Sequence, residues 1–234
     1  MKKKLENVIV NNYPSEKIEY IIASDHSTDE TNNIVQVFIE KHPEMSISLY
    51  NTKEHGGKTN AQNEAQKHAK GEILVMTDAN SMFEKNAISE LVACFTSLDI
   101  AYVTGRLIYD NSGDSLTANS ESTYWDSDLA QRNIESKIYT ITAGNGAIYA
   151  CRNEWYHDFE PICCHDFYMP YYYATQKKRS IYNPDACASE KAGESVRDEF
   201  KRKVRMNRTI LTSIKMGIKS LNFFKYGWFS YFYF

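Results

Sequence analysis

Apolar runs alternate with amphipathic segments along the first hundred residues. Three runs have the length and composition of strands: residues 18–24, 46–50 and 72–77. Between the first two runs, Ile34, Val35 and Phe38 share one helical face, and Pro43 ends that pattern. Between the second and third runs, alanine recurs with a period of four residues and Gly71 ends the segment, so we expect a second helix there. A third helix is expected over residues 85–97, and this alternation is typical of an α/β fold with a parallel sheet.

The pattern after residue 100 is less regular. Strands are predicted over four segments: residues 101–109, 138–142, 146–151 and 179–182. Helices are predicted over three more: residues 120–135, a stretch that opens at residue 163, and a basic helix over 194–217. With no internal repeat and no clear linker, we expect a single domain over residues 1–217, followed by a separate segment over 218–234.

The last fourteen residues are mostly aromatic and read LNFFKYGWFSYFYF. They are too few to span a bilayer, which takes about 20 apolar residues. Two interpretations stay open. The segment either packs on its own domain or lies at a membrane–water interface, where aromatic side chains are favoured.

Composition and charge narrow the class of protein. The 234 residues are 42% hydrophobic and 13% aromatic, which excludes a disordered chain, and a mean hydropathy of −0.53 excludes a polytopic membrane protein. The 27 basic and 30 acidic residues give a net charge of −3, so the chain lacks the basic field of a nucleic-acid binder. Five cysteines without a tight repeat, and a lysine-rich start without an apolar run, favour a reducing cytoplasm.

Acidic side chains follow two of the predicted strands. Asp25 and Asp78 lie at strand ends, and ligands of parallel α/β sheets bind beyond the carboxyl ends of the strands. The carboxylate of Asp78 and the amide of Asn80 can face one Mg²⁺ or Mn²⁺ ion, which also binds phosphates. An Asx-turn explains the same two residues equally well. Asp29 is best explained as a helix cap.

Two further groups of residues are candidates for chemistry. Asp166 stands at a predicted helix start, where it is either a general base or a cap. The adjacent Cys163 and Cys164 precede it, and adjacent cysteines without a second pair do not suit a zinc site. Arg202 and Arg205 share a helix face and either clamp a diphosphate or face solvent or an anionic membrane.

Six short motifs occur in an order that resembles family 2 glycosyltransferases, in their processive-synthase-like branch. They are SDHSTD (24–29), GKTNAQN (57–63), TDAN (77–80), GNGAIY (144–149), HDF (165–167) and RKVRM (202–206). His26 replaces a glycine, Asn80 replaces the second aspartate of DxD, and Arg202 and Met206 replace the Gln and Trp of QxxRW. The family's first strand is expected to be missing, because residues 5–14 look like the helix and turn that follow it.

The resemblance implies an α/β fold of the GT-A, nucleotide-diphospho-sugar transferase type, with a mostly parallel mixed sheet flanked by helices. It implies inverting transfer from a nucleotide-sugar, UDP-linked, to a hydroxyl of a glycan or lipid-linked acceptor. The setting it implies is cell-surface polysaccharide or glycan synthesis at the cytoplasmic face of the membrane. Two alternatives stay open: a non-catalytic domain that binds a nucleotide or a partner, and a metal-dependent phosphohydrolase that uses the same carboxylates.

The resemblance also implies a role for each candidate residue. Asp25 would bind the uracil or ribose of the donor, and Lys58 would bind its phosphates. Asp78 and Asn80 would bind the Mg²⁺ or Mn²⁺ ion. Asp166 is the catalytic base. Three residues complete the expected site: Arg202 and Arg205 cover the diphosphate, and Trp125, beside Tyr124, stacks on the acceptor unless it belongs to the core.

Overall fold

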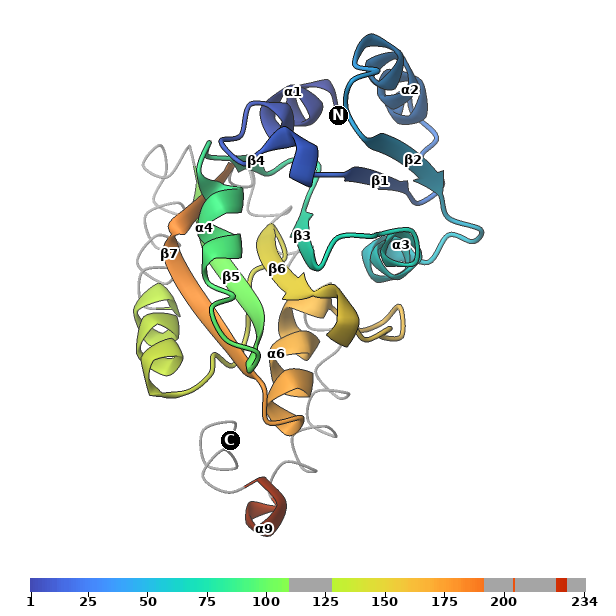
Figure 1. Ribbon diagram of the computed structural model, residues 1–234. Helices are drawn as coiled ribbons and strands as arrows, with labels where there is room; N and C mark the ends of the chain where they lie inside the picture. Colours follow the sequence, from blue (N-terminus) through green and yellow to red (C-terminus); the bar gives the residue numbers. More distant parts are fainter. Residues whose placement is uncertain (110–127, 192–203, 205–221, 227–234) are drawn as a thin grey trace.

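The strands form two sheets in the computed structural model, which describes residues 1–109, 128–191, 204 and 222–226 (Figure 1). The smaller sheet pairs β1 (Tyr20–Ser24) with β2 (Ile47–Asn51) in parallel. The larger sheet has the order β3-β6-β5-β7-β4. Its strands are β3 (Ile73–Thr77), β4 (Met82–Phe83), β5 (Ile100–Tyr109), β6 (Ile148–Arg152) and β7 (Arg179–Glu190).

Parallel and antiparallel pairs both occur, so the arrangement of strands is mixed, as expected. Of the five pairs among the described residues, β1–β2 and β5–β7 are parallel, and β3–β6, β5–β6 and β4–β7 are antiparallel. Two of the antiparallel pairs involve β6. This strand follows β5 in the sequence, but it lies between β3 and β5 and runs in the opposite direction to both. Within the same described residues, β1 pairs only with β2 and β3 only with β6, so the two sheets meet without a shared ladder.

The helices of the first half of the chain largely follow the predictions: α1 (Lys2–Ile9), α2 (Thr31–Lys41), α3 (Gly57–Gln66) and α4 (Ala87–Ala93). The described part of the second half contains a helix over residues 128–138, α6 (His165–Thr175) and α9 (Phe223–Tyr226). Two 3-10 turns, η1 (Ser15–Lys17) and η2 (Asn153–Trp155), complete the list. The backbone amide of Thr31 donates to the Asp29 carboxylate just before α2, but the N-cap residue of this helix is Glu30 and not Asp29.

The predicted strand over residues 138–142 is wrong. The helix over 128–138 extends into this segment, and the rest is irregular. Its backbone instead runs beside the start of β7, where the Ile141 amide donates to the Ser180 carbonyl over 2.8 Å. The adjacent residues Thr140 and Ile141 are both buried, so this segment packs beside β7 without forming a regular ladder.

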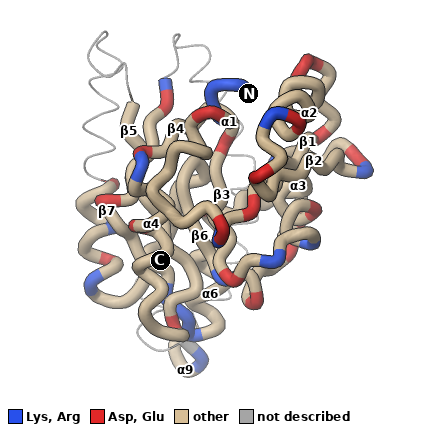
Figure 2. Tube along the Cα trace, turned by 45° about the horizontal axis from the view of Figure 1, so that its top comes forward, with Lys and Arg blue, Asp and Glu red and all other residues tan. Residues whose placement is uncertain are grey.

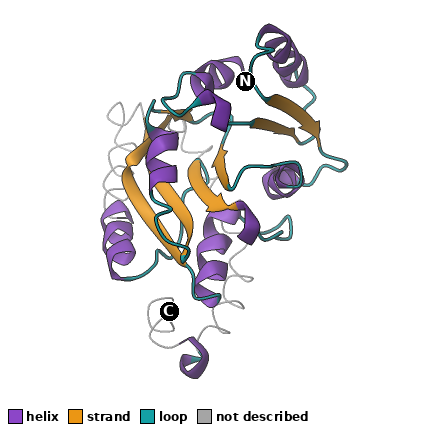
Figure 3. Ribbon diagram, viewed as in Figure 1, coloured by secondary structure: helices purple, strands orange, loops and turns teal. Residues whose placement is uncertain are grey.

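Helices α4 and α6 flank the larger sheet (Figure 3), and alternating side chains of β5 and β6 form a core beneath each of them. Tyr102 and Tyr149 face α6 and pack with Met169, whereas their neighbours Val103 and Ile148 pack with α4. A third, smaller core joins α1 to α2 through three buried side chains: Leu5, Val35 and Phe38. The faces of the sheet are thus occupied by packing, which leaves the strand ends for chemistry.

Over the described residues, neither sign of charge dominates the surface. Acidic and basic residues are interspersed along the trace in Figure 2. Within the described part of the chain, no helix is long and apolar enough to cross a membrane. Of the aromatic segment over 218–234, the described residues 222–226 include α9, whose Phe224 is fully exposed. The predicted basic helix over 194–217 lies, apart from residue 204, outside the described residues.

Candidate functional site at the end of β3

A lysine joins three separate segments at the end of β3. Asp78 follows β3 directly, and Lys58 is the second residue of α3. The Lys58 ammonium lies 2.5 Å from Oδ1 of Asp78 and donates to the Gly146 carbonyl over 2.9 Å. The two charged side chains are 46% and 33% exposed, so solvent and ligands reach this ion pair. Its contribution to stability is therefore small, about 1 kcal/mol or less.

Asp166 lies on the same site, at the second position of α6. A Cβ atom added to Gly146 would be 2.9 Å from Nζ of Lys58 and 3.0 Å from Oδ2 of Asp166, so a larger residue there would have to displace one of these two side chains. Burial raises the pKa of the Asp166 carboxyl, the nearby Lys58 opposes this rise, and the Asp78 charge adds to it. A carboxylate with a raised pKa is a stronger base, as proton abstraction requires.

Asp25 has a different environment from the one expected for a nucleoside ligand. Its Oδ1 accepts hydrogen bonds from the Thr52 hydroxyl and the Gly56 amide, and its Oδ2 accepts one from the Gly57 amide. His55 Nδ1 lies 2.9 Å from Oδ2. Partial burial works against the charged form, but these hydrogen bonds and His55 hold the pKa of Asp25 below its usual value.

These contacts assign Asp25 a structural task at this site. A carboxylate has about four lone-pair positions, and protein groups occupy them here. The carboxylate therefore orders the glycine turn that leads into Lys58, and Gly57 has a φ of 78° there, a conformation that favours glycine. A direct contact with a nucleoside requires one donor to move away, and His55, whose side chain is 76% exposed, is free to do so.

The turn after β3 offers oxygen ligands to a cation. The Ser81 amide donates to the Asp78 carbonyl over 3.2 Å and closes the turn, while the Asp78 carboxylate faces Lys58 and Asn80 is exposed. Among the described residues, no three His, Cys, Asp or Glu side chains gather around one point. The donor set fits Mg²⁺ or Mn²⁺, because these ions need only one or two carboxylates when substrate phosphates supply further oxygens.

A buried polar chain behind Asp166 was missed in the sequence. His165 is 2% exposed, and its Nε2 lies 2.8 Å from the Tyr156 hydroxyl, which donates to Asn63 of α3 over 2.9 Å. Burial, with Lys58 and His157 nearby, lowers the pKa of His165 to about 3, so the imidazole is neutral. These hydrogen bonds link the start of α6, which carries Asp166, to α3, which carries Lys58. A histidine beside the candidate base was the only signal for it in the sequence.

Three of the predicted site residues, Trp125, Arg202 and Arg205, lie outside the described residues, as does Tyr124. The structure brings Lys58, Asp78 and Asp166 together and connects Asp25 to them through the turn that precedes α3. The roles assigned to the undescribed residues stay predictions.

Comparison with known proteins decides the family. A family model described as Glycosyl transferase family 2 matches residues 2–159, more than half of the chain. The chain belongs to this family. Family membership agrees with the order of the six motifs and with the arrangement of Lys58, Asp78 and Asp166 around the end of β3.

Two curated relatives are similar over part of the family 2 domain. A probable glycosyltransferase, YdaM of Bacillus subtilis (strain 168), is 32% identical over 81 residues, which are 34% of this chain and 19% of that protein. An N-acetylglucosaminyltransferase of Rhizobium meliloti (strain 1021) is 26% identical over 148 residues, 63% of this chain and 33% of that protein. The aligned parts thus cover a third or less of these relatives.

Solved structures establish the GT-A fold. The mannosyltransferase PcManGT from Pyrobaculum calidifontis, in complex with GDP-Man and Mn²⁺, matches 92% of this family 2 chain and 60% of its own, with a TM-score of 0.76 and 23% identity. TarS 1–349 of S. aureus, in complex with UDP-GlcNAc, matches 94% of this chain and 62% of its own, with a TM-score of 0.60 and 15% identity.

Proposed function

We propose that this family 2 protein transfers a sugar, with inversion, from a UDP-linked donor to a hydroxyl of a glycan or lipid-linked acceptor. One observation carries the proposal: Lys58, Asp78 and Asp166 converge on Gly146 at the end of β3. The Lys58 ammonium and the partly exposed Asp78 carboxylate provide a site for a metal-bound diphosphate, and the buried Asp166 carboxylate provides a base. The names of the similar proteins support a nucleotide-sugar donor, since GDP-Man and UDP-GlcNAc are bound by two of them.

Each residue has a part in a single displacement. Lys58 binds the diphosphate, and Asp78 with Asn80 holds Mg²⁺ or Mn²⁺, which supplies positive charge where the leaving diphosphate becomes more negative. The acceptor oxygen forms its bond to the anomeric carbon as the bond to the diphosphate breaks, and the diphosphate leaves with that electron pair. Asp166 takes the proton of the acceptor hydroxyl.

The remaining expectations belong to the same proposal. Arg202 and Arg205 cover the diphosphate, and Trp125 stacks on the acceptor sugar. The basic segment and the aromatic end of the chain hold the protein at the cytoplasmic face of a membrane, where cell-surface polysaccharide or glycan is made. A beta-monoglucosyldiacylglycerol synthase of Synechocystis, 29% identical over 85 residues, supports a lipid-linked acceptor by its name. Binding of the chain to anionic vesicles at low salt is the expected result, and its absence contradicts the membrane part.

The test is release of nucleotide from a panel of UDP- and GDP-sugars, with and without Mn²⁺. We expect release from a UDP-sugar that depends on Mn²⁺ and stops in Asp166→Asn. The matched control is Asp158→Asn, an exposed aspartate in the loop before α6, which keeps full activity. Nucleotide binding without turnover in the wild type points to the non-catalytic alternative. Phosphate release from simple phosphate esters points to a phosphohydrolase.

A further inference from the structure

One lysine near the start of the chain is buried against the turn that carries Asp78. Lys4 lies on α1 and is 6% exposed, although Lys2 and Lys3 beside it face solvent. Its ammonium donates to the Thr77 hydroxyl over 2.8 Å and to the Ser81 carbonyl over 2.5 Å. It also lies 4.3 Å from the centre of the Phe83 ring.

The two hydrogen-bond partners of Lys4 bracket the proposed metal ligands. Thr77 immediately precedes Asp78, and Ser81 immediately follows Asn80, so a single ammonium group ties both ends of this turn together. The Ser81 hydroxyl in turn donates to Glu190 at the end of β7. The conformation of the turn therefore depends on a charge that comes from α1.

A second residue of α1 fixes the strand that follows the turn. The Asn7 side chain donates to the Phe83 carbonyl over 2.8 Å and accepts from the Phe83 amide over 2.7 Å. Asn7 is three residues from Lys4 and on the same helical face. Through these two side chains, α1 is hydrogen-bonded to both ends of the turn and to β4, at Thr77, Ser81 and Phe83.

Burying the Lys4 ammonium costs free energy, and the packing of α1 alone gives no reason for a charged side chain at this position. Burial lowers the pKa of Lys4 to about 8, and the charges of Asp78 and Glu190 act in the opposite direction. An apolar side chain of similar length would fill the same space without that penalty. The contacts that such a side chain cannot make are the two hydrogen bonds to the turn.

We propose that Lys4 is a positioning residue that keeps the Asp78–Asn80 turn in the shape that binds a metal–diphosphate complex. The inference rests on the proposed function for the identity of the ligand. It adds a residue outside the six family motifs, on a helix that contributes none of the expected site residues. Partners that orient metal ligands typically change metal affinity or activity by about 10–100-fold when they are removed.

The test measures binding of Mn²⁺ in the presence of UDP, from the spin-resonance signal of free Mn²⁺, with the full chain. We expect Lys4→Met to weaken this binding roughly tenfold or more. Lys3→Met, which removes the same charge from the exposed side of α1, is the matched control and keeps the wild-type affinity. Lys4→Arg, which retains a charged donor, is expected to recover part of the loss. Equal affinity of wild type and folded Lys4→Met overturns the inference.

Hydrogen exchange of the metal-free protein separates this inference from the proposed function. We expect amides of residues 77–83 to exchange faster in Lys4→Met than in the wild type and Lys3→Met. If the wild type binds no Mn²⁺ with UDP, the proposed function fails, and unchanged exchange in Lys4→Met then overturns the positioning role as well. If Lys4→Met does not fold, Thr77→Val takes its place, because it removes one of the two hydrogen-bond partners of Lys4. Weaker Mn²⁺ binding than in the wild type then supports the positioning role, and equal affinity contradicts it.

Discussion

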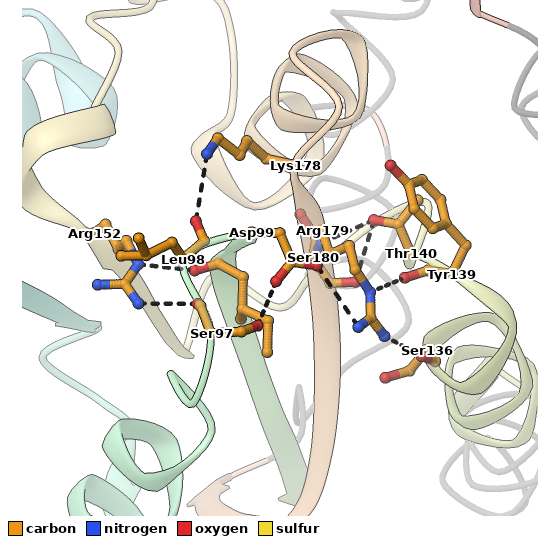
Figure 4. A network of polar contacts seen from close by, with 11 residues as sticks. Ser97, Leu98, Asp99, Ser136, Tyr139, Thr140, Arg152, Lys178, Arg179 and Ser180 are labelled. Carbon is orange, nitrogen blue, oxygen red and sulfur yellow. Dashed lines mark hydrogen bonds and ion pairs between the residues drawn. The ribbon is translucent and has the colours of Figure 1, made fainter.

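The two ends of the larger sheet use basic side chains in different ways. At the end where β5 and β7 begin, Arg152, Lys178 and Arg179 donate to backbone carbonyls of neighbouring loops (Figure 4). Lys178 also lies 3.7 Å from the centre of the Trp155 ring. At the end where β3 stops, Lys58 also donates to a backbone carbonyl, that of Gly146, but its ammonium is closely paired with the carboxylate of Asp78 and lies beside Asp166.

The difference separates cations that stabilise the fold from cations available to a ligand. A backbone carbonyl carries no net charge and cannot be protonated at ordinary pH, so its partner stays in place. A carboxylate can exchange a lysine for a metal ion, and a lysine can exchange a carboxylate for a phosphate. We therefore expect changes at the β5–β7 end to affect stability, and changes at the β3 end to affect binding and turnover.

The largest expected effect is on turnover. Asp166→Asn preserves the size of the side chain but removes the base, so we expect the transfer rate to fall by roughly 10²–10⁴-fold. Donor binding should change little, because Lys58 and Asp78 remain. Steady-state kinetics and UDP calorimetry on the same preparation measure the two quantities, and loss of both together contradicts the assignment.

The pH profile of the wild type adds a second check on Asp166. The base works only when deprotonated, and burial raises its pKa above the usual value for an aspartate. Activity should therefore fall, as the pH is lowered, at a higher pH than an ordinary aspartate would allow.

The next effect is on stability at the opposite end of the sheet. Arg179 donates to the Tyr139 carbonyl over 2.9 Å and lies 3.9 Å from an Asp99 carboxylate oxygen. We expect Arg179→Met to lower the free energy of unfolding by about 0.5–1.5 kcal/mol, because it removes hydrogen bonds to carbonyls that water can partly replace. The KM for the donor should stay at the wild-type value. A change in KM without a change in urea midpoint would break the distinction between the two ends.

A further expected effect is the pH dependence of stability that His165 contributes behind the β3 end. The folded state lowers the pKa of His165 to about 3, whereas the unfolded chain has a value near 6.5. As the pH falls below about 6.5 the unfolded state takes up the proton first, so stability is complete above that pH and is lost towards pH 3. The slope from this group is at most about 1.4 kcal/mol per pH unit. Urea unfolding from pH 7 to 4 should show a shallower slope in His165→Gln, and an unchanged slope contradicts the prediction.

Local patterns predicted much of the fold, because β1, β2, β3, α2 and α3 are specified by their own residues. The place of β6 between β3 and β5 was not predictable, since strand order depends on contacts between distant segments. The same applies to residues 138–142, where Ile141 is hydrogen-bonded to Ser180 of β7 without joining the sheet as a strand.

The site shows the same division. Asp78, Lys58 and Asp166 were recognisable because each stands in a short motif at a strand or helix end. Lys4 was not, because a run of three lysines after Met1 reads as a solvated cluster, and only packing of α1 on residues 77–83 buries one of them. Asp25 was recognised as a site residue, but its saturation by Thr52, His55 and two glycine amides depends on the geometry of the turn.

Calorimetry of UDP binding, with and without Mn²⁺, tests most directly whether the β3 end holds a metal–diphosphate complex. We expect Mn²⁺ to tighten UDP binding to the wild type and to Arg179→Met by the same factor, about tenfold or more. In Asp78→Ala, UDP affinity should be the same with and without the metal, because the carboxylate ligand is gone. An identical gain from Mn²⁺ in wild type and Asp78→Ala, or no gain in either, would contradict the account.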